Sequence, residues 1–113
     1  MEHKMHLHHD PFCLIQEGKK TIEMRVNDEK RQLIHVGDSI EFSDRDTKDI
    51  ILTEVVKIHH FSNFEELLKN LDKEALGYLK EDIPDPVDLE KYYSKEEQAK
   101  YGVVGIEIKL VKE

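Results

Sequence analysis

Residues 20–26 alternate between apolar and polar side chains in the way that a β-strand requires. Successive side chains of a strand point to opposite faces, so the segment divides into two sets. The apolar set comprises Ile22, Met24 and Val26, and the polar set comprises Thr21, Glu23, Arg25 and Asn27. The apolar face is suited to packing against a core. The opposite face is therefore either a solvated surface or the floor of a polar pocket.

Lys20 stands at the entrance to this polar set but has the wrong parity for it. In a regular strand its side chain would lie on the face opposite Glu23 and Arg25. Lys20 joins them only if the strand begins after residue 20 or contains a bulge there. The alternative interpretation is an ion pair along a surface strand, which contributes little stability.

The N-terminal segment predicts a strand followed by a helix. Met5 and Leu7 alternate with histidines, which indicates the first strand. Asp10-Pro11 then has the form of a helix start, because an aspartate can cap free amides and proline tolerates the first helical position. Gly18 is expected to end this helix.

Further strands are expected at 39–42, 50–61 and 103–111, the last with alternating apolar residues on one face. Two capping-box patterns, beginning at Ser62 and at Ser94, predict helices. The acidic, proline-containing segment 72–92 between them is expected to form loops and short helical pieces. Together these patterns predict an α+β protein, a small and partly open β-barrel with flanking short helices.

The composition fits one domain covering residues 1–113. Hydrophobic residues make up 38% of the chain and charged residues 37%, as in a soluble globular protein. No apolar run approaches the roughly 20 residues that span a bilayer, so no membrane partner is expected. A single cysteine, Cys13, excludes an internal disulfide and favours a reducing cytoplasm. We expect Cys13 to face the core from the first helix.

Charge is unevenly distributed in this acidic chain, whose formal net charge is −8. Residues 19–31 carry five basic and three acidic groups, a net charge of +2. Residues 62–100 carry six basic and eleven acidic groups, a net charge of −5. This balance argues against a protein that coats nucleic acid without specificity and favours a short or small anionic ligand over a long duplex. The acidic stretch 81–97 is either a solvated face or a docking surface for a basic protein partner.

A family resemblance follows from a set of spaced residues that extends over nearly the whole chain. The set comprises Pro11-Phe12, Ile15, Gly18-x-Lys20-Thr21-x-Glu23-x-Arg25, Gly37-Asp38 and Tyr101-Gly102. It resembles the ASCH domain family of the PUA-like superfamily, and the continuation through Asn27 and Asp28 resembles a bacterial and phage branch. The resemblance implies a β-barrel with a cleft beside the first helix, lined by Lys20, Glu23 and Arg25. It also implies a role in binding RNA or nucleotides.

The chemistry of the three cleft residues can be judged separately from the resemblance. Arg25 offers a rigid fork of donors that suits a phosphate or a base edge. Lys20, if partly desolvated beside it, can serve as a general base or nucleophile. Glu23 can hold both cations in place, act as an acid or base, or accept a hydrogen bond from an exocyclic amine.

An enzymatic alternative also follows from the resemblance. Some relatives hydrolyse the amide of N4-acetylcytidine with a lysine, a threonine and a glutamate, and another branch cleaves RNA. The corresponding catalytic residues here would be Lys20, Thr21 and Glu23. The position of the threonine nucleophile is occupied by Glu23, whereas Thr21 is displaced by roughly 7 Å along the strand. Whether the protein is an enzyme is therefore left open.

Histidines and tyrosines complete the candidate ligand-binding set. His6 and His8 form an H-x-H pair without a third ligand at a definite spacing, so no metal or other cofactor is expected. His8 is placed at the rim of the cleft, just before the first helix. Tyr92, Tyr93 and Tyr101 offer either a stacking surface or loop packing, and Tyr101 is preferred for ligand contact. The expected ligand-binding residues are Lys20, Glu23, Arg25, Asn27, His8 and Tyr101. A third hypothesis is a small adaptor that acts through protein contacts.

Overall fold

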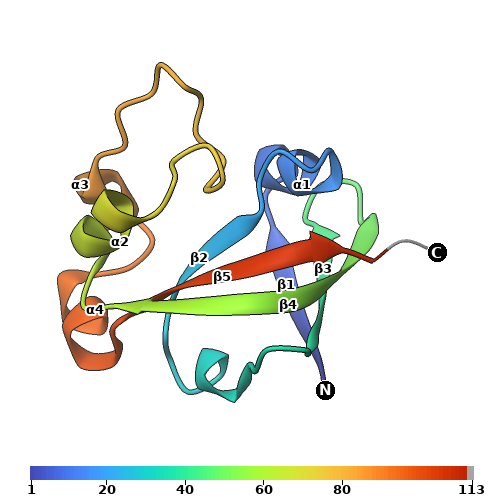
Figure 1. Cartoon of the computed structure of the whole chain (residues 1–113), viewed down its shortest axis with the longest axis horizontal. Coiled ribbons are helices and arrows are strands. Elements are labelled where there is room, and N and C mark those ends of the chain that lie inside the picture. Colours follow the sequence, from blue (N-terminus) through green and yellow to red (C-terminus); the bar gives the residue numbers. More distant parts are fainter. Residues whose placement is uncertain (112–113) are drawn as a thin grey trace.

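The computed structural model describes residues 1–111, whose five strands form one sheet in the order β1-β3-β4-β5-β2 (Figure 1). The strands are β1 (Glu2–Leu7), β2 (Ile22–Val26), β3 (Ser39–Asp44), β4 (Ile50–Phe61) and β5 (Val103–Leu110). β1 pairs with β3 in parallel, and the other pairings are antiparallel. β1 and β2, which come first in sequence, therefore occupy the two edges of the sheet.

Short helices surround the sheet, at the ends and edges of the strands. They are α1 (His9–Gln16), the 3-10 helix η1 (Arg31–Leu33), α2 (Phe64–Asn70), α3 (Pro86–Leu89) and α4 (Lys95–Tyr101). Figure 1 shows α2, α3 and α4 gathered at one end of the sheet, with α1 near the other end. Within residues 1–111, no helix is long and apolar enough to cross a membrane.

The predicted architecture is confirmed, because the sheet curls into a half-barrel with short helices around it. β4 has the expected limits, and β5 ends one residue before the expected residue 111. β3 continues two residues beyond the expected residue 42. β2 begins only at Ile22, which removes Lys20 from the strand.

Two apolar clusters on opposite faces hold the sheet. Alternation along β5 supplies both, with Val104, Ile106 and Ile108 in one and Val103 in the other. The first cluster fills the concave side and includes Phe12 and Ile15 of α1. The second lies beneath α2 and takes up the apolar face of β2. Both faces of β2 are therefore constrained, one by apolar packing and the other by the polar residues described below.

Helix starts differ in detail from the expected caps. His8, rather than Asp10, is the N-cap of α1, and no side chain caps this helix. Asp10 lies inside the first turn, where a negative charge is favourable beside the exposed amides. Asn63, rather than Ser62, caps α2, whereas the predicted capping box at Ser94 is confirmed.

The chain between α1 and β2 is fixed by a long loop from a distant part of the sequence. Gly18 has a φ of +78°, which confirms it as the point where α1 stops. The backbone amides of Thr21 and Ile22 both donate to the carbonyl oxygen of Ala75, at 2.8 and 3.0 Å. Residues 71–85, which arch away from the sheet in Figure 1, are thereby attached to the start of β2.

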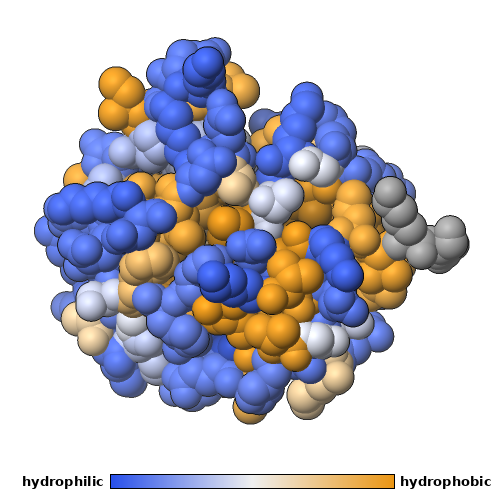
Figure 2. All heavy atoms as spheres, in the orientation of Figure 1, coloured by the Kyte–Doolittle hydropathy of each residue, from blue (hydrophilic) through white to orange (hydrophobic). Residues whose placement is uncertain are grey.

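Apolar side chains remain exposed at the end of the sheet where β4 begins and β5 ends. Figure 2 shows hydrophobic residues on this face of the molecule, surrounded by hydrophilic ones. Ile50, Leu52 and Val111 are 59%, 42% and 44% exposed. The amide of Val111 donates to the carbonyl of Leu52, which places these two residues side by side.

Close packing at Gly105 of β5 gives the first prediction. A Cβ atom there would lie 2.7 Å from Leu71 Cδ1 and 3.2 Å from Ile22 Cγ2. We expect Gly105→Val to lower the free energy of unfolding by about 1–3 kcal/mol, because the added methyl groups overpack this contact. Urea denaturation measures the change. Leu71→Ala should partly relieve it, so additive effects in the double variant would contradict this account.

Candidate functional site

Three charged side chains form a compact cluster at the start of β2. Lys20 Nζ lies 3.0 Å from Oε1 of Glu23. Arg25 donates to Oε2 of the same carboxylate from Nε at 3.1 Å and from Nη2 at 2.9 Å. One carboxylate therefore joins two cations, with the arginine in a two-pronged arrangement that fixes its plane.

The cluster is largely withdrawn from solvent. The exposed fractions of the Lys20, Glu23 and Arg25 side chains are 9%, 6% and 15%. Burial would raise the pKa of the Glu23 carboxyl, but the charges and hydrogen bonds of the two cations outweigh it and lower this pKa. Burial likewise opposes the charged form of Arg25, but the Glu23 charge raises its pKa. Glu23 and Arg25 are therefore held in their charged forms.

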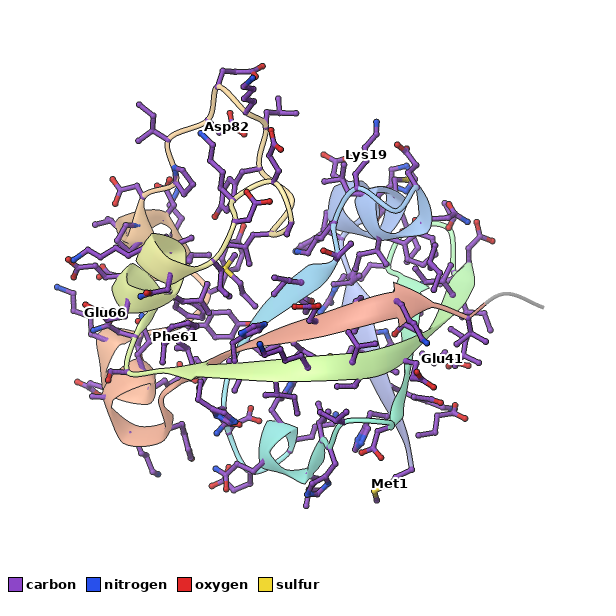
Figure 3. The ribbon with its side chains drawn as sticks, viewed as in Figure 1. Met1, Lys19, Glu41, Phe61, Glu66 and Asp82 are labelled. Atoms are coloured by element: carbon purple, nitrogen blue, oxygen red, sulfur yellow. The ribbon has the colours of Figure 1, made fainter. Side chains whose placement is uncertain are left out.

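Lys20 reaches the carboxylate because it precedes the strand. The amides of Lys19 and Lys20 both donate to the carbonyl of Leu14, so the chain turns before β2 starts. The Lys20 stem then packs beside Gly77, where a Cβ atom would lie 3.1 Å from Lys20 Cδ. Figure 3 shows the neighbouring Lys19 pointing away from the protein. The arrangement in which the strand begins after residue 20 is therefore the one observed.

Arg25 also connects the two edges of the sheet. Its Nη2 atom donates to the backbone carbonyl of His6 in β1 at 3.1 Å. β1 and β2 do not pair with each other, so this side chain spans the opening of the half-barrel. A cleft lies at this opening.

The cleft has a volume of about 600 Å³, which is within the usual range for small-molecule sites. Its lining comes from the end of β1, the start of α1, β2, the turn after β3, and the α3 region. The lining residues are His6, Leu7, His8, His9, Asp10, Pro11, Lys20, Glu23, Met24, Arg25, Arg45, Asp46, Leu89, Tyr92 and Tyr93. The charged cluster forms one wall, and tyrosine, leucine and methionine side chains supply an apolar one.

The structure brings together four of the six expected ligand-binding residues. Lys20, Glu23, Arg25 and His8 all line the cleft. Asn27 lies in a separate pocket with Arg31, because the chain turns toward η1 immediately after β2. Among the three residues suggested for catalysis, Thr21 does not line the cleft.

The tyrosines that line the cleft are Tyr92 and Tyr93, and not Tyr101, which the sequence analysis preferred. The Tyr101 hydroxyl donates to Glu29 at 3.0 Å, away from the cleft, whereas Tyr92 and Tyr93 line it. Tyr93 packs with Phe64 at a centroid distance of 5.4 Å, and burial raises the pKa of its hydroxyl. Arg45 is a further lining residue that the sequence pattern did not indicate. The adjacent tyrosines at positions 92 and 93 were the available signal in the sequence for this wall.

The histidine pair expected at H-x-H does not form on one strand. β1 ends at Leu7, and the His6 ring shares a hydrogen bond with Ser43 at 2.7 Å. Among residues 1–111, the candidate metal ligands are instead His9, Asp44 and Asp46, whose ligand atoms lie within 4.8 Å of one another. Hydrogen bonds account for this group, because Asp44 accepts from backbone amides and pairs with His9 at 2.6 Å.

Cys13 is not directed into the core as expected. It lies on α1 beside His9, with its sulfur 3.5 Å from Nε2, and is only partly buried. Burial and the nearby carboxylates of Asp44 and Glu17 raise the pKa of the thiol, which favours its unreactive protonated form.

A half-barrel with a polar cleft between its edge strands defines a PUA-like domain, a fold generally associated with RNA binding. The model of the ASCH domain matches residues 5–112, and the chain belongs to this family. The comparison with curated proteins gives no match.

Solved structures support the same assignment. The hypothetical protein PH0355 is 32% identical, with a TM-score of 0.81 over 98% of this chain and 100% of that one. Protein PF0455 from Pyrococcus furiosus is also 32% identical, with a TM-score of 0.71 and full coverage of both chains. ASCH from Zymomonas mobilis shares the fold at 15% identity and a TM-score of 0.69, over 98% of this chain and 71% of that one. The bacterial or phage branch is not confirmed, because an archaeal protein is among the similar structures.

Removing the Glu23 carboxylate, which Lys20 and Arg25 share, should destabilise the protein. Glu23→Ala leaves two buried cations without a counter-charge, so we expect the free energy of unfolding to fall by about 3–5 kcal/mol. Chemical denaturation measures the change. Glu54→Ala, which removes an exposed pair with Lys109, is the control and should change stability by about 0.5 kcal/mol or less. Equal effects of the two substitutions would show that the cluster is not energetically coupled.

The contribution of the buried Asp44 carboxylate to stability should be lost at low pH. Burial would raise the pKa of Asp44, but its hydrogen bonds with His9 and backbone amides lower it to about 2, against an ordinary 3.8. The stability that this group contributes is present above pH 3.8 and is lost as the pH falls toward 2. We therefore expect Asp44→Asn to flatten the decline in stability between pH 4 and 2, measured by urea unfolding at each pH.

His9 acts in the opposite direction. Its hydrogen bond with Asp44 raises the pKa of the imidazole above 6.5. That contribution to stability is present below pH 6.5 and is lost as the pH rises through the raised pKa of His9.

The Asp44→Asn variant should keep part of the acid dependence, because the pKa of Asp38 is also about 2. Identical slopes for the wild type and Asp44→Asn below pH 4 would refute the assignment.

Proposed function

We propose that this protein binds RNA or a nucleotide, including modified nucleotides, in the cleft between its edge strands. The observation that carries the proposal is the buried cluster of Lys20, Glu23 and Arg25 at the wall of a cleft of about 600 Å³. Structural ion pairs also occur in proteins without ligands. A buried cluster in a cleft is nonetheless a candidate functional site with a physical rationale.

The opposite wall supplies surfaces for a base. Tyr92 is 67% exposed and lines the cleft with Tyr93, Leu89 and Met24. Aromatic faces stack on single-stranded bases, and the apolar neighbours exclude water from the contact. His8 at the rim can stack on a base or hydrogen-bond to it. The size of the cleft suits one base or a few nucleotides.

Hydrolysis is a rival to binding for the same cleft. The amidohydrolase or ribonuclease alternatives would use Lys20 and Glu23 with a nucleophile such as Thr21. Thr21 does not line the cleft, and both Glu23 oxygens already accept hydrogen bonds from Lys20, Arg25 and the Met24 amide. For this reason we prefer binding, and turnover is an outcome of the experiment below.

A protein partner is the second candidate function. Leu79, Ile83 and Val87 are 60%, 91% and 60% exposed within or beside the acidic segment 81–97. Figure 3 places Asp82 at the tip of the long loop, away from the sheet. Such a surface would suit a basic partner with apolar side chains, as an adaptor requires. Location in the cytoplasm is part of the proposal and stays a prediction.

Adjacent lysines provide a matched test of the cleft. Lys19 forms an exposed pair with Glu17, whereas Lys20 forms the buried pair with Glu23. We expect short single-stranded RNAs to cause saturable amide NMR shifts at residues 20–25 and at Tyr92 and Tyr93. Lys20→Met should weaken binding at least about tenfold, the value of one charge-assisted contact. Lys19→Met should change affinity less than about twofold.

The same titrations distinguish the rival functions. N4-acetylcytidine is included, and each sample is followed for conversion of the ligand. Conversion that Lys20→Met abolishes would make the protein an enzyme. Tyr92→Ala, an exposed position, tests the cleft without disturbing the buried cluster and should also weaken RNA binding. If no RNA or nucleoside shifts any cleft residue, the nucleotide proposal is wrong and the acidic surface becomes the better candidate.

A further inference from the structure

The carboxylate at the centre of the cluster has no remaining capacity to accept hydrogen bonds. A carboxylate offers about four lone-pair sites on its two oxygens. Oε1 of Glu23 faces Lys20 Nζ at 3.0 Å and accepts from the Met24 amide at 3.2 Å. Oε2 accepts two N–H groups of Arg25, at 3.1 and 2.9 Å. Glu23 therefore positions the cations and is not available to accept from the exocyclic amine of a base.

The two cations, in contrast, retain unused donors. A guanidinium has five N–H groups, and Arg25 uses Nε and Nη2 toward Glu23 and the carbonyl of His6. Arg25 also forms a side-chain hydrogen bond with Tyr93, so four of its five N–H groups have partners and one is left for a ligand. The Lys20 ammonium has three N–H groups and pairs with Glu23. The cluster thus presents free donors from Lys20 and Arg25, while the Glu23 carboxylate is fully occupied.

Charge leads to the same conclusion as the donor inventory. Two cations share one carboxylate, so the cluster carries a net charge of +1 in side chains that are at most 15% exposed. A charge withdrawn from water is costly unless it is paired. The other acidic residues in the lining, Asp10 and Asp46, lie near His9 and contribute to raising its pKa. A ligand with one negative charge would neutralise the cluster.

From these observations we infer that the cluster is a phosphate-binding subsite. This inference rests on the proposed function and adds its selectivity: the cleft holds a nucleotide by its phosphate group, with the base against the tyrosine wall. A neutral nucleoside offers carbonyl acceptors but no counter-charge, so it would leave the +1 charge uncompensated. Charge-assisted contacts from a fork and an ammonium are the arrangement that phosphates favour.

A ligand series with one constant base tests the assignment. Cytidine carries no phosphate, cytidine 5′-monophosphate carries a terminal one, and the dinucleotide cytidylyl-(3′,5′)-cytidine carries one internal diester. We expect cytidine 5′-monophosphate to bind at least about tenfold more tightly than cytidine, measured by amide NMR titration. Comparison with the dinucleotide distinguishes a terminal from an internal phosphate. Inorganic phosphate should shift residues 20–25 without shifting Tyr92.

Two variants test whether the gain comes from the cluster. Lys20→Met should reduce the ratio between the monophosphate and cytidine to near one, while Lys19→Met should preserve it. Arg25→Lys keeps the charge but removes the fork, so it should reduce the ratio partly and leave the protein closer to its native stability. The gain should also shrink as salt increases, because screening weakens charge attraction.

The outcomes separate this inference from the proposed function. Equal affinities of cytidine and its monophosphate, with shifts in the cleft, would overturn the phosphate subsite and leave nucleotide binding intact. RNA binding without any response of residues 20–25 to the monophosphate would also overturn the subsite alone. The absence of shifts with every ligand, including RNA, would overturn both. A ratio that survives both Lys20→Met and Arg25→Lys would place the phosphate elsewhere.

Discussion

One buried carboxylate, that of Glu23, constrains the architecture around the cleft. A carboxylate that is 6% exposed must have its charge compensated, and here Lys20 and Arg25 compensate it. Lys20 can approach only if the chain leaves α1, turns, and enters β2 two residues later. That turn in turn requires the carbonyls of Leu14 and Ala75 as backbone acceptors. The triad of Lys20, Glu23 and Arg25 therefore links the positions of α1, β2 and the loop that contains Ala75.

The same triad has consequences for the open side of the sheet. Edge strands leave backbone groups unpaired, and proteins commonly protect them by covering or charging the edge. Here Arg25 satisfies the carbonyl of His6 on the opposite edge, at 3.1 Å, without bringing β1 and β2 into register. The half-barrel is thus bridged by a side chain and not by a ladder of hydrogen bonds. The space that remains between the strands is lined by the polar side chains of both edges, which is why a cleft and not a closed barrel results.

Sequence patterns predicted the features that depend on local periodicity. The limits of β4, the alternation of β5 around Ile106 and the capping box at Ser94 all follow from neighbouring residues and were found as expected. The alternation of side chains also indicated that Lys20 could join Glu23 only if the strand began after residue 20 or contained a bulge, and β2 begins at Ile22. The features that were not predicted depend on long-range packing. Tyr92 enters the cleft because α3 packs against α2 and the second apolar cluster, and Tyr101 leaves it because Glu29 lies within hydrogen-bond distance. No local pattern specifies either neighbour, and the N-cap at His8 likewise lacks a side-chain signal.

The strand that carries the cleft residues pairs with a strand that comes much later in the sequence. Within residues 1–111, β2, which carries Glu23 and Arg25, pairs in the sheet with β5 alone, and β5 is the last of these strands in sequence. The loop acceptor Ala75 and the tyrosine wall are also encoded well after β2. During synthesis from the N-terminus, β1, β3 and β4 can associate while β2 still lacks a neighbour. β2 can therefore gain its sheet partner only after residues 103–110 have been synthesised. The geometry of the cleft thus depends on the last strand, and a chain cut before residue 103 would lack the sheet partner of the strand that carries Glu23 and Arg25.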